Sequence, residues 1–232
     1  MKVIGMIGGM SWESSLEYYR IVNEEVKKRL GGLHSAKVLM LSVDFYEIEE
    51  LQSSGNWQES ARILIKAARD LEKGGAEFVL ICTNTMHKVA PEVQASIKIP
   101  LIHIADAVGE EINKQNLYKV GLLGTKFTME QDFLKGHLVD KFNLDVIIPG
   151  ADSRQIVHEV IYNELCLGSI RKESKQSYCE IIEEMAKSGA QGVILGCTEI
   201  SLLVQSADVS LPLFDTTAIH CRKAVDFSLN GN

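Results

Sequence analysis

The sequence has no long apolar run and no cluster of basic residues. None of its apolar stretches approaches the roughly 20 residues that a membrane-spanning helix needs, so we expect no membrane partner. Acidic residues outnumber basic ones by 31 to 24, and the formal charge of −7 argues against non-specific nucleic-acid binding. Glycines interrupt the apolar start at residues 3–10, which we interpret as a buried first strand rather than a signal peptide. We therefore expect a cytoplasmic protein.

Cysteine and histidine are few, and they lack the spacings of known structural sites. The five cysteines are an odd number and include no Cys-x-x-Cys pair, so they do not suggest a disulfide framework. The six histidines form no His-x-His or His-Glu-x-x-His motif, and we predict no metal site. The glycine-rich patterns that bind nucleotide phosphates are also missing. At 46% hydrophobic and 24% charged residues, the composition is that of an ordinary globular protein.

What the sequence does contain is an alternation of β-branched apolar runs and amphipathic segments of helical period. This alternation is typical of parallel sheets covered by helices on both faces, joined by right-handed crossovers. Strands are predicted at residues 3–7, 38–43, 78–82, 120–123, 146–148 and 193–195, and helices at residues 12–30, 57–73, 155–165 and 172–187. Helix starts are predicted at Asn56 and Thr128, each followed three positions later by Glu or Gln.

An internal repeat relates the two halves of the chain. Residues 73–83 resemble residues 187–197 at an offset of 114, and residues 4–9 resemble residues 120–125 at an offset of 116. Helix–glycine–strand units resemble one another in general, but two matches in the same order favour a duplicated unit. We predict two pseudo-symmetric α/β domains, 1–104 plus 214–232 and 105–213, each with a central parallel sheet flanked by helices. The active site is expected in the cleft between them, since ligands in such sheets bind beyond the strand C-termini.

The repeat places two chemically interesting residues at equivalent strand ends. Thr83 in the segment 82–85 corresponds to Cys197 in the segment 196–199. Two such groups on opposite sides of one ligand suit a reaction that removes a proton from one face of a carbon and delivers one to the other. Racemisation is a reaction of this kind, and thiols suit it because their pKa is readily tuned.

Both segments resemble the active-site motifs of the aspartate/glutamate racemase family. The first reads Leu80-Ile-Cys-Thr-Asn-Thr-Met-His87 and the second Val193-Ile-Leu-Gly-Cys-Thr-Glu-Ile200; segments 8–11 and 215–218 also look like that family. The resemblance covers essentially the whole chain. It implies an amino-acid racemase that uses no cofactor and no pyridoxal phosphate, takes one catalytic residue from each domain and forms a homodimer.

The first motif departs from the family pattern. Family members usually carry Cys-Asn-Thr there, whereas this chain has Thr83 before Asn84 and its cysteine one place earlier, at Cys82. Either Thr83 takes the catalytic position, as in a subset of the family, or Cys82 does so through a shift of the loop. We favour Thr83, because the repeat register selects it and adjacent strand residues point to opposite faces. The resemblance implies that Cys197 takes the proton from the L-enantiomer. Because a hydroxyl is a weak base, we expect the reverse reaction, which starts at Thr83, to be slow.

Eight further residues are predicted to bind the substrate. They follow strand ends or lie near them, and helix capping or a tight turn is the alternative interpretation for most of them. They are Met10, Ser11, Gln52, Asn84, Thr85, Thr125, Thr198 and Glu199. We do not assign Glu199 the role of activating Cys197, because a nearby carboxylate raises a thiol pKa.

The side-chain specificity and some other residues are less clearly indicated. The region 44–52 contains no Arg or Lys to hold an acidic side chain, which leaves Gln52 as a hydrogen-bonding partner and favours a relaxed specificity for aspartate and glutamate. His87 is interpreted as a surface or capping residue, and Cys166, Cys179 and Cys221 as small buried residues.

Other functions stay open at this point. Related enzymes include hydantoin racemases, maleate isomerases and arylmalonate decarboxylases. A binding protein for acidic amino acids without turnover is the main alternative outside enzymes, and a redox sensor built on Cys197 is a weaker one.

Overall fold

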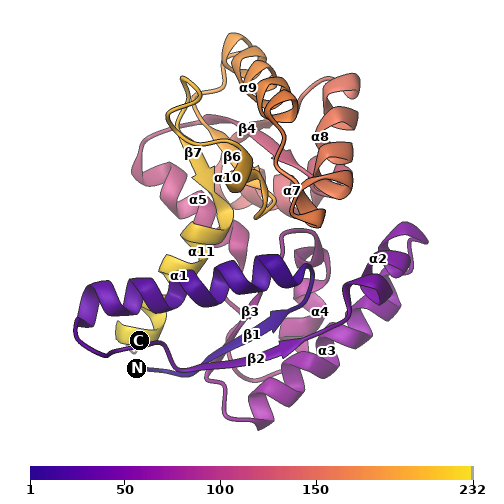
Figure 1. Ribbon diagram of the computed structural model, residues 1–232. Coiled ribbons are helices and arrows are strands. Elements are labelled where there is room, and N and C mark those ends of the chain that lie inside the picture. Colours follow the sequence, from indigo (N-terminus) through magenta and orange to yellow (C-terminus); the bar gives the residue numbers. More distant parts are fainter. Residues whose placement is uncertain (231–232) are drawn as a thin grey trace. The chain divides into compact units, whose positions relative to one another are not determined.

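The computed structural model describes residues 1–230, whose contacts divide the chain into two compact units (Figure 1). Among the described residues, unit 1 comprises Met1–Ile104 and residues 220–230, and unit 2 comprises Ala105–Ile219. The sequence-based domain boundaries differ from this division over residues 214–219, which group with unit 2 because a short strand there pairs within that unit. Each unit is an α/β layer structure with a parallel sheet.

The sheet of unit 1 has the strand order β2-β1-β3, with all pairs parallel. Its strands are β1 (Ile4–Gly8), β2 (Val38–Ser42) and β3 (Phe78–Ile81), and an isolated parallel bridge joins Val79 to Leu101 beyond β3. The residues of β1 and β3 are buried throughout, as expected for strands covered on both faces.

Helices cover both faces of this sheet (Figure 1). The helical elements are α1 (Trp12–Leu30), α2 (Phe45–Ser53), α3 (Trp57–Lys73), η1 (Thr85–Val89), α4 (Ala90–Ala95) and α11 (Thr216–Asn230), the last of which enters unit 1 at His220. Alternating strand residues divide between two cores: Ile4 and Met6 pack with α1 and α11, whereas Ile7 packs with α2, α3 and α4.

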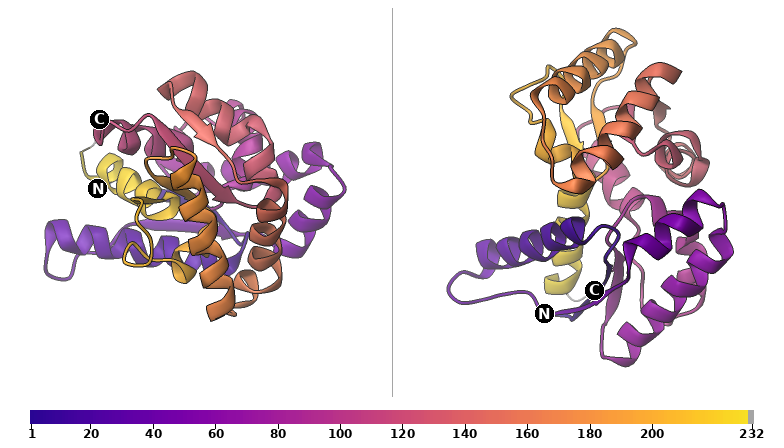
Figure 2. Two further views of the ribbon diagram at one scale, coloured as in Figure 1. Left: turned by 90° about the horizontal axis from the view of Figure 1, so that it is seen from above. Right: turned by 45° about the vertical axis from the view of Figure 1, so that its right-hand side comes forward.

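The sheet of unit 2 has the parallel order β5-β4-β6-β7. Its strands are β4 (Lys119–Gly124), β5 (Asp145–Ile147), β6 (Val193–Gly196) and β7 (Leu213–Asp215). Its helical elements are α5 (Ile104–Lys114), α6 (Lys126–Glu130), α7 (Asp132–Phe142), α8 (Ala151–Asn163), η2 (Leu165–Leu167), α9 (Lys172–Lys187) and α10 (Ile200–Leu203). Helices α8 and α9 pack together on one face of the sheet, as Figure 1 and Figure 2 both show.

The two sheets share one topology, which confirms that the halves are related. β2, β1 and β3 take the places of β5, β4 and β6, and the Val79–Leu101 bridge corresponds to the pair Val193–Leu213. Even single hydrogen bonds recur: the Val79 N–H donates to the Pro100 carbonyl at 2.8 Å, and the Val193 N–H donates to the Pro212 carbonyl at 2.9 Å. The α/β class and the parallel sheets flanked by helices are therefore as predicted.

Several local predictions differ from the structure. The helix predicted at residues 155–165 begins earlier and ends earlier, as α8 (Ala151–Asn163). Strand β7 was not predicted, because it has only three residues and follows a proline. Thr128 does not cap a helix; Thr125 does so at the start of α6, where its hydroxyl oxygen accepts from the Thr128 N–H at 3.3 Å. The Asn56 cap is confirmed, since its side chain accepts from the Glu59 N–H at 3.3 Å.

Candidate active site

The first half-site is the loop after β3, residues 83–85. Thr83 is partly exposed, whereas Cys82 before it and Asn84 and Thr85 after it are buried. The loop leads directly into η1, so Thr83 stands at the carboxyl end of the sheet, where ligands of α/β folds bind.

Cys82 lies on the other side of the chain from Thr83, inside the hydrophobic core. Its side chain is fully buried in the cluster that contains Ile4, Tyr18 and Phe78. Burial raises the pKa of the Cys82 thiol far above its ordinary value. A thiol held in an apolar core and kept protonated is poorly suited to proton transfer with a substrate.

The turn between β1 and α1 lies beside this loop. The Ser14 hydroxyl donates to the Cys82 carbonyl at 2.9 Å and so ties the first turn of α1 to the end of β3. Ser11 is the N-cap of α1, with its hydroxyl oxygen accepting from the Ser14 N–H at 3.2 Å. Gly9 has a φ of +90°, and a β-carbon there would overlap the Val43 carbonyl oxygen. Only glycine fits where the turn approaches the end of β2 so closely.

Met10 and Gln52 are both buried in unit 1. Met10 packs into the same core cluster as Ile48, so any role it has in binding a ligand falls to its backbone. Gln52 lies near the end of α2, and its Nε2 lies 3.0 Å from the sulfur of Met86, just beyond the first half-site. Gln52 is thus close to the loop in space, as its predicted role requires.

The interpretation of His87 as a surface or capping residue is wrong. Its side chain is 1% exposed, because η1 turns it inward rather than toward solvent. Nδ1 lies 2.8 Å from the Thr83 carbonyl oxygen, and Nε2 accepts from the Ile104 N–H at 3.2 Å. One of these partners, Ile104, lies 17 residues further along the chain, so no local pattern could have revealed the burial of His87.

The second half-site is the loop after β6, residues 197–199. Cys197 is partly exposed, whereas Thr198 and Glu199 are buried, which repeats the pattern of residues 83–85. The Thr217 hydroxyl donates to the Thr198 hydroxyl at 3.0 Å and holds the loop against the start of α11. The segment 215–218, noted in the sequence for its resemblance, therefore has a place beside this half-site.

The thiol of Cys197 donates a hydrogen bond to the Glu199 carboxylate, with 2.9 Å between Sγ and Oε2. Burial and the negative charge of Glu199 together raise the pKa of Cys197 well above its ordinary value. In this state the thiol is protonated and keeps its proton in the hydrogen bond to Glu199.

Thr125 follows β4 as Cys197 follows β6. Gly124 and Gly196 are paired across these strands, so the two residues start from neighbouring strand ends. The Thr125 hydroxyl oxygen caps α6, which fits the capping interpretation. The next residue, Lys126, was not considered in the sequence; it is exposed and forms no ion pair within residues 1–230. Its position directly after a predicted binding residue is the signal that could have found it.

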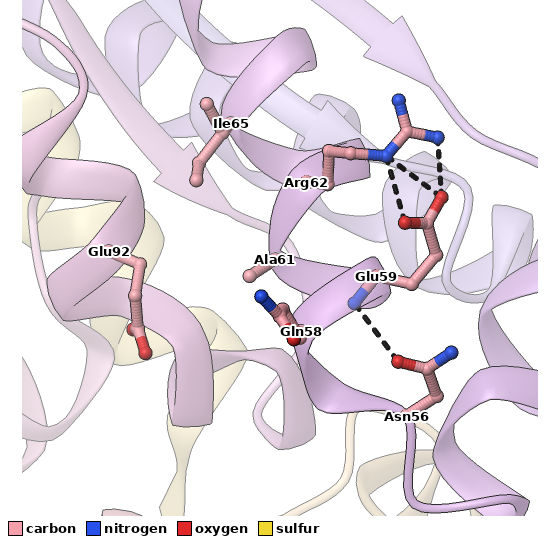
Figure 3. Close-up of a pocket in the computed structure, with 7 residues that line it drawn as sticks. All are labelled: Asn56, Gln58, Glu59, Ala61, Arg62, Ile65 and Glu92. Atoms are coloured by element: carbon pink, nitrogen blue, oxygen red, sulfur yellow. Dashed lines mark hydrogen bonds and ion pairs between the residues drawn. The ribbon is translucent and has the colours of Figure 1, made fainter.

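A separate surface pocket lies on unit 1 beside α3 and α4 (Figure 3). Its polar groups are largely used within the protein: Glu59 pairs with Arg62, and its backbone N–H bonds Asn56. None of the predicted site residues lines it. We therefore do not regard it as the catalytic site.

Among residues 1–230, no group of three or more His, Cys, Asp or Glu side chains is arranged to hold a metal ion. No helix in the same range is long and apolar enough to span a membrane.

Comparison with known proteins places this architecture in a family of isomerases. The model of the Asp/Glu/hydantoin racemase family matches residues 7–224. The structure of a candidate Asp/Glu racemase from Yersinia pestis is 52% identical, covers 99% of this chain and 100% of its own, and superposes with a TM-score of 0.93. An aspartate racemase homologue from Pyrococcus horikoshii OT3 is 36% identical, with coverage of 98% and 99% and a TM-score of 0.86.

A curated relative supports the same assignment. The broad specificity amino-acid racemase RacX of Bacillus subtilis is 22% identical over 236 residues, which cover 96% of each chain. With a family match over nearly the whole chain and related structures above 30% identity, this chain belongs to the Asp/Glu/hydantoin racemase family.

Proposed function

We propose that this protein racemises aspartate, glutamate or both without a cofactor, by moving a proton between the two faces of Cα. The observation that carries the proposal is the equivalence of Thr83 and Cys197. Each is the partly exposed residue in the loop after a parallel strand, and each is followed by two buried polar residues. Two such positions, one in each half of a duplicated fold, suit a two-base reaction.

Cys197 is the principal base in this proposal. Its thiolate, formed when the thiol loses its proton to solvent, takes the Cα proton of the L-enantiomer. The ammonium group of a bound substrate beside Glu199 would offset the charge that raises the Cys197 pKa, and so favour the thiolate. The buried hydroxyl of Thr198 and the half-site around it then hold the reacting groups in place.

Thr83 is the weaker partner on the opposite face. Its hydroxyl delivers a proton to the carbanion, and solvent then restores the hydroxyl. The reverse reaction needs the same oxygen as a base, which is unfavourable because a hydroxyl is a far weaker acid than a thiol. The burial of Cys82 in an apolar core supports Thr83 over Cys82 for this role.

The substrate class rests on charge. Lys126 follows Thr125 at the end of β4, and β4 is paired with β6, the strand that leads to Cys197. Its positive charge suits the side-chain carboxylate of an acidic substrate. Gln52 adds a hydrogen-bonding group without charge near the first half-site. The names of the relatives, an aspartate racemase homologue and a broad specificity racemase, support an acidic substrate with relaxed selection.

The proposal is tested in D₂O with the L- and D-forms of aspartate and glutamate supplied separately and no cofactor added. Proton NMR follows the Cα–H signal, and chiral chromatography separates the two enantiomers. We expect loss of the Cα–H signal and appearance of the other enantiomer with the wild type and with Cys82→Ala, but not with Cys197→Ala. Exchange that survives Cys197→Ala and disappears with Cys82→Ala would reverse the assignment. Absence of exchange with all four amino acids would favour a binding protein or another reaction of the family.

A further inference from the structure

The loop that carries Thr83 is fixed from behind by a buried histidine. His87 bonds the Thr83 carbonyl oxygen through Nδ1 at 2.8 Å and the Ile104 N–H through Nε2 at 3.2 Å. A carbonyl oxygen can only accept and an amide N–H can only donate. The imidazole is therefore neutral, with its proton on Nδ1.

The rings of two other histidines contact the ring of His87. The ring of His103 lies 4.7 Å from it and the ring of His220 lies 5.7 Å from it, both edge-on. His220 is bonded to the Ile102 carbonyl oxygen at 2.7 Å and to the Tyr18 hydroxyl at 2.8 Å. Burial, followed by the two neighbouring histidines, lowers the pKa of His87 well below its ordinary value and keeps it neutral.

The second partner of His87 is also informative. Ile104 is the first residue of α5 and the last residue of unit 1 before the chain passes into unit 2. The His87 side chain therefore connects the backbone of Thr83 to the backbone of Ile104, where the chain leaves unit 1. A small displacement of either segment would be transmitted to the other through two directed hydrogen bonds.

We infer that His87 is a positioning residue for Thr83, which fixes the loop so that the Thr83 hydroxyl meets the substrate. This inference rests on the proposed function of Thr83. His87 does not touch the substrate, and its role is limited to the step in which Thr83 takes part. Loss of the Nδ1 bond should impair proton delivery by Thr83 and leave proton removal by Cys197 intact.

Deuterium exchange separates these two steps. With an L-substrate in D₂O, Cys197 alone can exchange the Cα proton and return deuterium to the same face, which gives deuterated L-amino acid. Inversion to the D-form also requires Thr83. The ratio of deuterated L-product to D-product at early times therefore reports how well Thr83 functions, and a general loss of folded protein would lower both products equally.

Two amide substitutions test the two hydrogen bonds of His87 separately. The Nδ2 of Asn in His87→Asn stands near the original Nδ1 and can still donate to the Thr83 carbonyl. The Oε1 of Gln in His87→Gln stands near the original Nε2 and can accept from Ile104, but no donor faces Thr83. His220→Gln is the matched control, because it changes another fully buried histidine of the cluster and keeps a donor for the Ile102 carbonyl.

The experiment follows this ratio with L-glutamate and L-aspartate for the wild type and the three variants. We expect His87→Gln to raise the ratio of deuterated L-product to D-product at least tenfold. His87→Asn and His220→Gln should stay within about threefold of the wild type. An unchanged ratio in a folded His87→Gln protein, or an equal rise with His220→Gln, would overturn the inference about His87 and leave the proposed function standing. Absence of any exchange in the wild type would overturn the proposed function and this inference with it.

Discussion

At the scale of single residues, the pair formed by Cys197 and Glu199 determines how the proposed base works. The carboxylate accepts the thiol hydrogen bond at 2.9 Å, and its negative charge adds to burial in raising the thiol pKa. The carboxylate therefore opposes thiolate formation while its charge is uncompensated, and opposes it less when the ammonium group of a bound substrate offsets that charge.

Replacement of Glu199 should therefore lower the pKa of Cys197. In Glu199→Gln the negative charge disappears, so we expect the alkylation profile of Cys197 with iodoacetamide to move to lower pH by about one unit or more. Peptide-resolved mass spectrometry measures each cysteine separately. Cys179 on α9 is partly exposed and serves as the internal control, and its profile should not move. A Cys197 profile that stays in place or moves to higher pH would contradict this account of the pair.

At the scale of elements, the turns that follow the strands position the candidate loops. Gly9 lies in one of these turns, where there is no room for a β-carbon. We expect Gly9→Ala to lower the free energy of unfolding by about 3 kcal/mol or more, because a positive φ and an overlap with the Val43 carbonyl act together. Urea denaturation measures the loss.

Gly55 provides a control that also has a positive φ but has no overlap. Its φ is +73°, and a β-carbon there would meet nothing within 4 Å. We expect Gly55→Ala to cost about 1 kcal/mol. Equal losses at the two positions would show that the close approach at Gly9 does not matter.

Much of the element order could be predicted from periodicity, and the failures have physical causes. Helices α1, α3 and α9 have the bounds expected from their apolar spacing, since each runs through a full amphipathic pattern. The start of α6 was misplaced because Thr125 and Thr128 are both of a residue type that caps helices, and Thr125 is the one that caps α6. Strand β7 is too short to carry an alternation.

The candidate site, too, could be predicted only in part. The equivalence of residues 83 and 197 is visible in sequence because both follow similar strands of a duplicated unit, and the matching exposure of the two positions agrees with it. The burial of His87 could not be predicted, because His103, Ile104 and His220 reach it only in the folded chain. Which groups touch a substrate stays a prediction until the exchange measurements are made.

At the scale of the whole molecule, the buried histidines predict sensitivity to acid. Burial lowers the pKa of His220 to about 4 and that of His87 well below its ordinary value of about 6.5. The unfolded chain binds these protons more readily than the folded chain, so stability is highest above about pH 6.5 and falls as the pH drops toward 4. The His220 contribution alone amounts to roughly 3 kcal/mol.

Urea denaturation between pH 7.5 and pH 4.5 tests this dependence. We expect the free energy of unfolding to decrease steadily below pH 6.5 in the wild type. His220→Gln should lose clearly less over the same interval, because its side chain does not titrate. An identical slope in the two proteins would mean that His220 is not responsible for the acid sensitivity.

The two halves of the molecule share a topology and differ in their reactive residue, and this difference is the basis of the proposed mechanism. The equilibrium constant of a racemisation is one, so kcat/KM must be equal for the two enantiomers. A difference in strength between Thr83 and Cys197 can therefore appear only in the separate values of kcat and KM.

The most direct measurement of this claim is kcat from the L- and the D-enantiomer for the wild type and for Thr83→Cys. The account predicts a larger kcat from the L-enantiomer in the wild type. In Thr83→Cys, a thiol replaces the weak base, so kcat from the D-enantiomer should rise at least tenfold and approach the value from the L-enantiomer. Equal wild-type kcat values, or a Thr83→Cys protein with the wild-type ratio, would contradict the roles proposed for Thr83 and Cys197.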